Sequence, residues 1–154
     1  MAKVTYHTDA NTDVSLKVIG DHARAITVLI SDGVLPSNEG RGYVLRRILR
    51  RAVRHGRLLG IEGRFLTDLV DVVIDILGSG VPGLIEKHDF IKRVVANEED
   101  RFNQTLAQGL DMLGALINEL KEAKATEVPG AEVFKLYDTY GFPLDLTKEI
   151  LEEK

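Results

Sequence analysis

The sequence predicts an all-α protein, and three observations support this fold class. Apolar residues recur every three or four positions from about His88 to Lys124, which predicts one long helix. A second, amphipathic helix is expected from Tyr43 to Leu59, and its polar face consists of arginine. No stretch alternates apolar and polar residues as paired strands do. The expected architecture is therefore a helical domain with a long helix and an arginine-faced helix.

The first half of the chain contains two further predicted helices. Helical spacing predicts one from Ser15 to Ser31, with Ser15 as its N-cap. A polar loop with glycine and proline follows, from Leu35 to Gly42. After the arginine-faced helix, a helix is expected from Arg64 to Leu77. Because this helix is apolar nearly all round, we expect it to be buried.

The length of 154 residues suits one domain with a hydrophobic core. Residues 1–13 are expected to be a disordered lead-in or an expression remnant, and residues 14–154 a single helical domain. Its two parts are residues 14–80, with the basic helix at 43–59, and residues 84–154, with the long helix and two short helices. The short helices are expected at Ala131 to Tyr140 and after a cap at Asp145.

The composition argues against several classes of protein. Hydrophobic residues make up 44% and charged residues 29%, which is typical of a folded domain. No apolar run reaches the roughly 18 residues that span a bilayer, so we expect no membrane partner. The N-terminus lacks the apolar segment of a secretory signal, which favours a cytoplasmic location. The chain has no cysteine, and its four histidines are scattered, so no metal site is expected.

The net charge of −4 conceals a strongly basic segment. Between Gly40 and Ile61 there are seven arginines and no acidic residue, so this segment carries +7 and the remainder −11. On a helical projection, six of these arginines and Tyr43 fall within an arc of roughly 140°. The six are Arg46, Arg47, Arg50, Arg51, Arg54 and Arg57. The other side of the helix is apolar, so we expect one anchored face and one guanidinium face.

An arginine face is expected to have a binding partner, and three functions fit it. Arginines four residues apart repel each other by a few tenths of a kcal/mol, and no acid within the helix compensates for this repulsion. Since guanidinium groups suit bidentate phosphate contact, and Tyr43 can stack or donate, a nucleic-acid surface is favoured. One alternative is a protein-interaction module that docks an acidic partner. In the second alternative, acids from other helices pair with the arginines inside the fold, and the chain is only a structural connector.

Two long strings, GRGYVLRRILRRAVRHG and YDTYGFP, resemble alanyl-tRNA synthetases. The segment directly before the first string, SLKVIGDHARAITVLISDGVLPSNE, has the same resemblance. The similarity covers Val14 to Lys154. It corresponds to the helical tRNA-recognition segment that follows the class II catalytic core. The resemblance implies binding of the acceptor stem of tRNA for alanine and selection of that tRNA through a G·U pair. It implies Asn38, in PSNEGRGY, and Asp138, in LYDTYGFP, as the residues that recognise the bases.

The chemistry of these two residues suits a G·U pair. Guanine presents an amino donor in the minor groove, which a carboxylate accepts, while an amide can donate to a uracil carbonyl. Taken alone, Asn38 also fits a simple turn residue. Asp138 is harder to explain structurally, because a helix C-terminus disfavours an anion. We expect Phe134 and Tyr137 to be core residues.

The basic residues would hold the RNA backbone and carry no sequence information. This expected backbone-binding set comprises Arg41, Tyr43, Arg46, Arg47, Arg50, Arg51, Arg54 and Arg57. Nothing in the chain pairs a nucleophile with a base or forms a phosphate loop, so the fragment is expected to catalyse nothing and to need no cofactor. The resemblance implies that its parent is an ATP-dependent ligase that attaches alanine to tRNA. ATP, Mg²⁺, Zn²⁺ and the rest of the synthetase chain are implied for that parent only.

Overall fold

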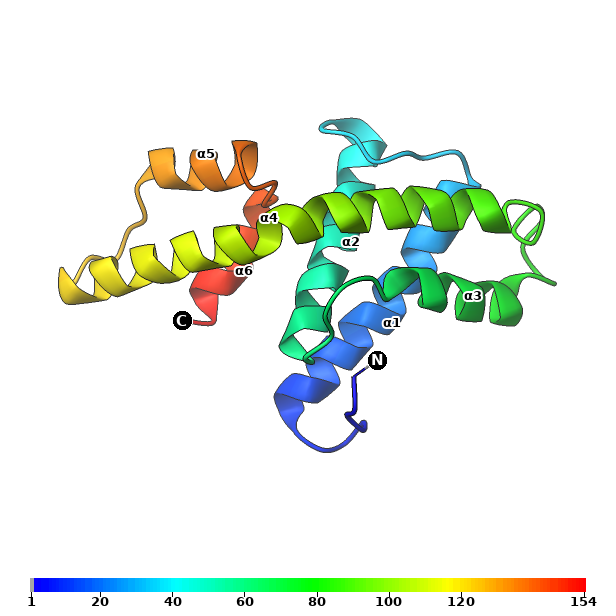
Figure 1. The fold of residues 1–154 in the computed structure, drawn as a ribbon, viewed down its shortest axis with the longest axis horizontal. Coiled ribbons are helices and arrows are strands. Elements are labelled where there is room, and N and C mark those ends of the chain that lie inside the picture. The colour runs from blue at the N-terminus through cyan, green and yellow to red at the C-terminus, as the bar shows by residue number, and fades with distance from the viewer. Residues whose placement is uncertain (1) are drawn as a thin grey trace. The chain divides into compact units, whose positions relative to one another are not determined.

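A computed structural model describes residues 2–154, which form six α-helices and no β-strand (Figure 1). The all-α prediction is confirmed. The chain divides into two compact units, one ending at Asp100 and the other beginning at Arg101. This division lies inside the long helix α4 (His88–Glu122), which was predicted to within two residues. It does not coincide with the expected boundary between residues 80 and 84.

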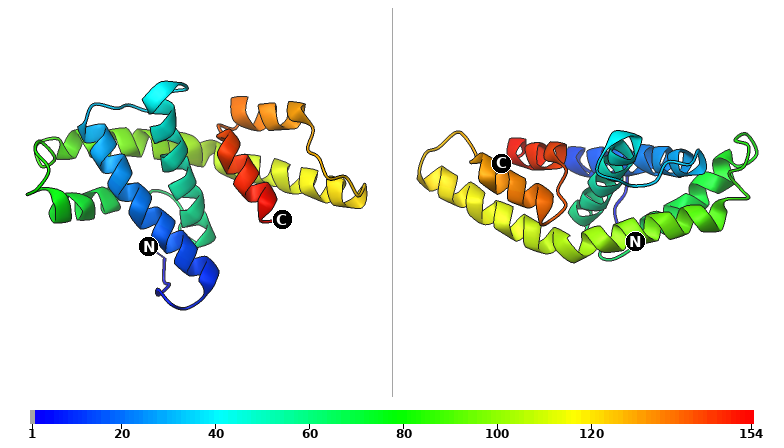
Figure 2. Two further views of the ribbon diagram at one scale, coloured as in Figure 1. Left: turned by 180° about the vertical axis from the view of Figure 1, so that it is seen from behind. Right: turned by 90° about the horizontal axis from the view of Figure 1, so that it is seen from above.

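The first unit contains α1 (Ala10–Ser31), α2 (Gly40–Leu58), α3 (Leu66–Leu77) and the beginning of α4. Helix α1 packs against both α2 and α3, and Figures 1 and 2 show α1 and α2 side by side. Each helix contributes its apolar stripe to the core, because burying apolar surface stabilises the fold by about 25 cal/mol per Å². The buried side chains of the stripes include Ile19, Ile26, Ile30, Leu45, Leu49, Val53, Val70, Ile74, Ile91 and Val95.

Helix α1 begins five residues earlier than predicted, and its cap is Asp9. The Asp9 side chain accepts a hydrogen bond from the backbone N–H of Thr12 at 2.9 Å, as an N-cap residue does. The predicted cap at Ser15 is therefore wrong, and residues 10–13 are helical. Ser15 is buried because it faces α2, where its Oγ lies 3.0 Å from Nδ1 of His55.

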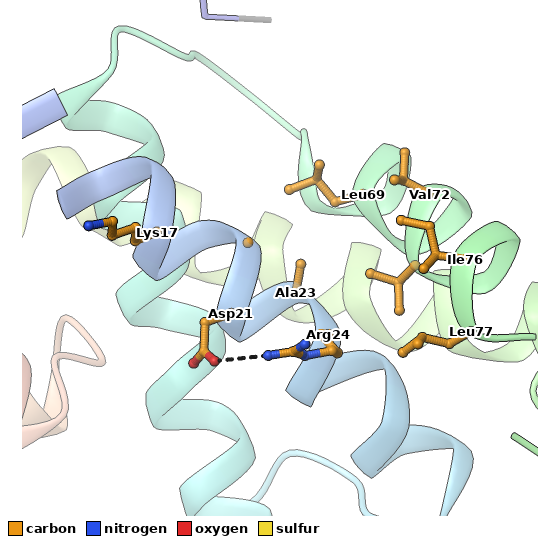
Figure 3. A pocket seen from close by; sticks show the side chains of 10 residues that line it. Lys17, Asp21, Ala23, Arg24, Leu69, Val72, Ile76 and Leu77 are labelled. Atoms are coloured by element: carbon orange, nitrogen blue, oxygen red, sulfur yellow. Dashed lines mark hydrogen bonds and ion pairs between the residues drawn. The ribbon is translucent and has the colours of Figure 1, made fainter. Parts of the chain in front are cut away.

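The expected burial of α3 is only partly correct. Val70 and Ile74 are buried, whereas Val72 is 49% exposed and Ile76 is 70% exposed. The exposed side chains line a groove of about 570 Å³ between α3 and α1 (Figure 3). Helix α1 contacts α3, yet these side chains of α3 stay exposed. An all-round apolar pattern therefore did not predict all-round burial.

The second unit contains the remainder of α4, α5 (Gly130–Asp138) and α6 (Leu144–Glu152). Helices α5 and α6 contact one another. Helix α6 begins directly after Pro143, so Asp145 lies in its first turn and the predicted cap at Asp145 is wrong. Proline suits this position because its fixed φ and missing N–H cost nothing at a helix start.

The segment between α5 and α6 is anchored on α4. Phe142 is fully buried, and its ring meets the edge of Phe102 with the centroids 5.7 Å apart. A Cβ atom at Gly109 would lie 2.5 Å from the Phe142 ring, so only glycine permits this approach. The hydroxyl of Thr105 also donates to the backbone oxygen of Tyr140 at 2.7 Å. These contacts fix the chain directly after Asp138.

Candidate nucleic-acid interface

Helix α2 begins at Gly40, three residues earlier than predicted, which places Arg41 and Tyr43 in its first turns. The preceding loop packs tightly against this helix start. A Cβ atom at Gly42 would overlap the backbone oxygen of Leu35 and the side chain of Ser37. Glycine at this position therefore lets the loop approach the helix, and the loop carries Asn38.

The arginine face of α2 is only partly open to solvent. Arg41 is exposed and Tyr43 is half-buried. Four arginines are half-buried, namely Arg46, Arg47, Arg51 and Arg57. Arg50 and Arg54 are 6% and 4% exposed. The expectation of a wholly exposed guanidinium face is therefore wrong at these two positions.

Glu98 of α4 explains the burial of Arg50. Its Oε1 accepts hydrogen bonds from Nε and Nη2 of Arg50 at 3.0 and 2.8 Å. The same oxygen accepts from Nε of Arg46 at 2.8 Å. Glu98 is itself 4% exposed, so one buried carboxylate serves two guanidinium groups. Pairing with an acid from another helix, one of the alternatives above, thus applies to this part of the face.

Sequence reasoning did not predict the role of Glu98, because it belongs to the mixed-charge run Glu98-Glu99-Asp100-Arg101, which resembles a solvated face. One signal was available. Glu98 continues the apolar stripe of α4, at the spacing of Ile91, Val95 and Phe102. A carboxylate in such a stripe requires a buried cation, and the arginine helix supplies it.

Asn38 is exposed at the start of α2. Its side-chain oxygen accepts a hydrogen bond from Nη1 of Arg46 at 2.5 Å. The Arg46 guanidinium therefore donates in two directions, to Glu98 and to Asn38. The structure thus brings one predicted base-recognition residue into direct contact with one predicted backbone-binding residue.

Helix α1 supplies a second acceptor to the arginine face. Nη1 of Arg51 lies 3.0 Å from Nε2 of His22, and Nδ1 of His22 lies 3.2 Å from Oδ2 of Asp21. Both contacts fit one neutral tautomer, in which Nδ1–H donates to the carboxylate and Nε2 accepts from the guanidinium. His22 therefore orients an arginine of the face.

Glu99, next to Glu98, is fully buried and caps α3 from another helix. Its carboxylate accepts hydrogen bonds from the backbone N–H groups of Phe65, at 2.8 Å, and Leu66, at 3.3 Å. Helix α3 has no side-chain cap of its own, so Glu99 satisfies donors that would otherwise be unpaired. Burial raises the pKa of Glu99 to about 7, although the two backbone donors oppose this rise.

Asp138 lies in the second unit, where it is the exposed last residue of α5. Phe134, one turn earlier, is 63% exposed, and Tyr137 is 38% exposed. The expectation that these two aromatic residues belong to the core is therefore wrong. Leu136 is the buried residue of this short helix, so the aromatic rings lie on its outer side. Asp138 and two aromatic side chains together form an exposed surface.

Comparison with known proteins places the chain in a family. The family model described as "tRNA synthetases class II (A)" matches residues 1–154. The chain belongs to this family of class II tRNA synthetases. It is 60% identical over 153 residues, 99% of its length, to an alanine–tRNA ligase of Thermoanaerobacter sp. (strain X514). It is 56% identical over 151 residues, 98% of its length, to the alanine–tRNA ligase of Clostridioides difficile (strain 630).

A third member of the family, the alanine–tRNA ligase of Ligilactobacillus salivarius (strain UCC118), is 57% identical over 149 residues, or 97% of the chain. The chain spans only 17% of the length of each of these relatives. Within residues 2–154, no helix has both the length and the apolarity needed to cross a membrane. In the same range, no three His, Cys, Asp or Glu side chains are grouped as a metal-ligand set.

Proposed function

We propose that this chain is the tRNA-recognition part of an alanine–tRNA ligase and binds the acceptor stem of tRNA for alanine. The observation that carries the proposal is the exposed Asn38 amide, held by Arg46 at the start of a basic helix. The family and the three named relatives support the assignment of the chain to an alanine–tRNA ligase. In this proposal, Asn38 donates to the uracil and Asp138 accepts from the guanine of a G·U pair.

The proposed backbone contacts come from the more open part of the arginine face. Arg41 is exposed, and Tyr43, Arg47, Arg51 and Arg57 are half-buried, so each can reach a phosphate with part of its side chain. Arg50 and Arg54 are buried, and we assign them to anchoring α2 within the fold. The proposal thus divides these six arginines into a binding group and an anchoring group. Arg46, which contacts both Glu98 and Asn38, belongs to neither group.

For the whole protein, we propose the activity that the relatives' names state, the ligation of alanine to its tRNA. As part of the same proposal, this ligation uses ATP and takes place in the cytoplasm. The parts of the synthetase outside this chain would then bind ATP, Mg²⁺ and Zn²⁺. The alternative, docking of an acidic protein on the basic helix, has less support. Two arginines of this helix, Arg46 and Arg50, already contact an acidic group of the same chain, Glu98.

Binding of two acceptor-stem hairpins, with G·U or G·C at the recognised pair, tests the proposed function. Asn38→Ala and Asp138→Ala should each abolish the preference for G·U, because each removes one base contact. Arg47→Ala and Arg57→Ala should weaken both hairpins alike and reduce the salt dependence by about one counterion each. If the unmutated chain binds neither hairpin at low salt, the proposed function is wrong.

A further inference from the structure

A chain of three side chains links the exposed surface to the interior of the first unit. Asn38 contacts Arg46, and Arg46 contacts the buried Glu98. We propose that Arg46 and Glu98 are positioning residues, which fix the Asn38 amide as an outward-pointing donor and so determine its selectivity for the base pair. This inference rests on the proposed function, since it assigns a cause to the selectivity of Asn38.

Arg46 selects one of the two orientations of the Asn38 amide. The oxygen and nitrogen of an asparagine amide are similar in size, so an isolated side chain can present either of them. A guanidinium donates only, and its hydrogen bond to the Asn38 oxygen is charge-assisted. Rotating the amide would turn its N–H groups toward a cation. The bond to Arg46 therefore leaves the NH₂ group of Asn38 as the outward donor.

Glu98 keeps Arg46 in place. A free arginine side chain samples many rotamers, and ordering it on binding would cost affinity. Nε of Arg46 donates to Oε1 of Glu98 at 2.8 Å, and the Arg46 side chain is only 14% exposed. Arg50 donates twice to the same oxygen and so orients the carboxylate in turn. The Asn38 donor is thus ordered before any RNA arrives.

A fixed donor can discriminate between base pairs by position. Wobble pairing displaces uracil from the place that the pyrimidine occupies in a Watson–Crick pair. Uracil and cytosine both present a carbonyl oxygen in the minor groove, so an amide free to move could follow either one. An amide held by Arg46 reaches only one of the two positions. The fixed position of the Asn38 amide, as well as its chemical type, therefore produces the preference for G·U.

Arg46→Lys tests the inference, with Arg47→Lys as the matched control. Both variants keep the positive charge, but lysine has no planar fork with which to contact Glu98 and Asn38 at once. We expect Arg46→Lys to reduce a G·U preference of about tenfold nearly to one, with little change in G·C affinity. Arg47→Lys should keep the preference. Adding Asn38→Ala to Arg46→Lys should cause no further loss of the G·U preference, because Arg46→Lys already leaves the Asn38 donor without a fixed position.

NMR of the Asn38 side-chain amide provides a measurement that does not depend on RNA. In the RNA-free chain, Arg46→Lys and Glu98→Gln should both increase the mobility of this NH₂ group, while Arg47→Lys leaves it unchanged. Unchanged mobility, or a G·U preference that survives Arg46→Lys, would overturn the positioning role. If the NMR result is as expected but the unmutated chain shows no preference between hairpins, the proposed function fails and the inferred selectivity role fails with it.

Discussion

Glu98 and Arg50 form a buried ion pair, in which Oε1 lies 2.8 Å from Nη2 and 3.0 Å from Nε. The two residues are 48 positions apart and belong to α4 and α2. The pair removes from solvent part of a face that helical periodicity alone assigns wholly to the surface. Helix α2 is therefore held by its apolar stripe on one side and by a buried carboxylate on the other.

We predict that Glu98→Ala destabilises the chain by about 3–5 kcal/mol, because it removes the carboxylate that pairs with the buried Arg50 guanidinium. Denaturant-induced unfolding, monitored by circular dichroism, measures this change. Asn97→Ala is the control, since Asn97 is the exposed neighbour of Glu98 on the same helix. That control should change the free energy of unfolding by no more than about 0.5 kcal/mol. Equal effects of the two substitutions would show that the ion pair contributes nothing.

The buried Glu99 predicts a pH dependence of stability. The pKa of Glu99 is about 7 in the folded chain against an ordinary value of 4.5. Between these two pH values, the Glu99 carboxyl is therefore protonated in the folded state and ionised in the unfolded state. The contribution of Glu99 to stability therefore falls as the pH rises from about 5 to 7, by on the order of 3 kcal/mol. Glu99→Gln keeps an oxygen that can accept from Phe65 and Leu66 but does not ionise.

The free energies of unfolding of Glu99→Gln and of the unmutated chain should therefore differ by different amounts at pH 5 and at pH 8. The variant should be the more stable protein at pH 8, and its advantage should shrink toward pH 5. A difference that stays constant between the two pH values would contradict the account of Glu99.

Two glycines of α4 should respond to alanine in opposite directions. At Gly109 an added Cβ meets the ring of Phe142, so Gly109→Ala should cost about 1–3 kcal/mol. At Gly114 nothing lies within 4 Å of the added Cβ, and Gly114→Ala should stabilise the helix by about 0.5–1 kcal/mol. Thermal unfolding of both variants measures the two effects. Stabilisation by Gly109→Ala would mean that Phe142 does not pack against α4 as described.

The features that the sequence predicts well are those encoded locally. The long helix and the arginine-faced helix follow from periodicity within single segments, and their predicted bounds are close to those observed. The burial of Arg50 depends on Glu98, far away in the chain, so no pattern within α2 itself reveals it. Ser15 failed as a predicted cap for a related reason, since its partner is His55 of another helix.

The base-recognition residues illustrate a different limit. Periodicity and charge identify a basic surface but do not distinguish Asn38 from a turn residue, and both Asn38 and Asp138 were assigned through the family resemblance. The structure adds the contact between Asn38 and Arg46, which depends on the loop packing against Gly42. Backbone packing of this kind is a tertiary property that residue types alone do not specify.

The most direct test of the proposed recognition is a competition measurement on the unmutated chain. Equal amounts of a G·U hairpin and a G·C hairpin, labelled with different fluorophores, compete for a limiting amount of the 154-residue protein. If Asn38 and Asp138 recognise the wobble pair, the bound fraction should be enriched in G·U by about tenfold. Equal amounts of the two hairpins in the bound fraction would contradict base recognition by this chain.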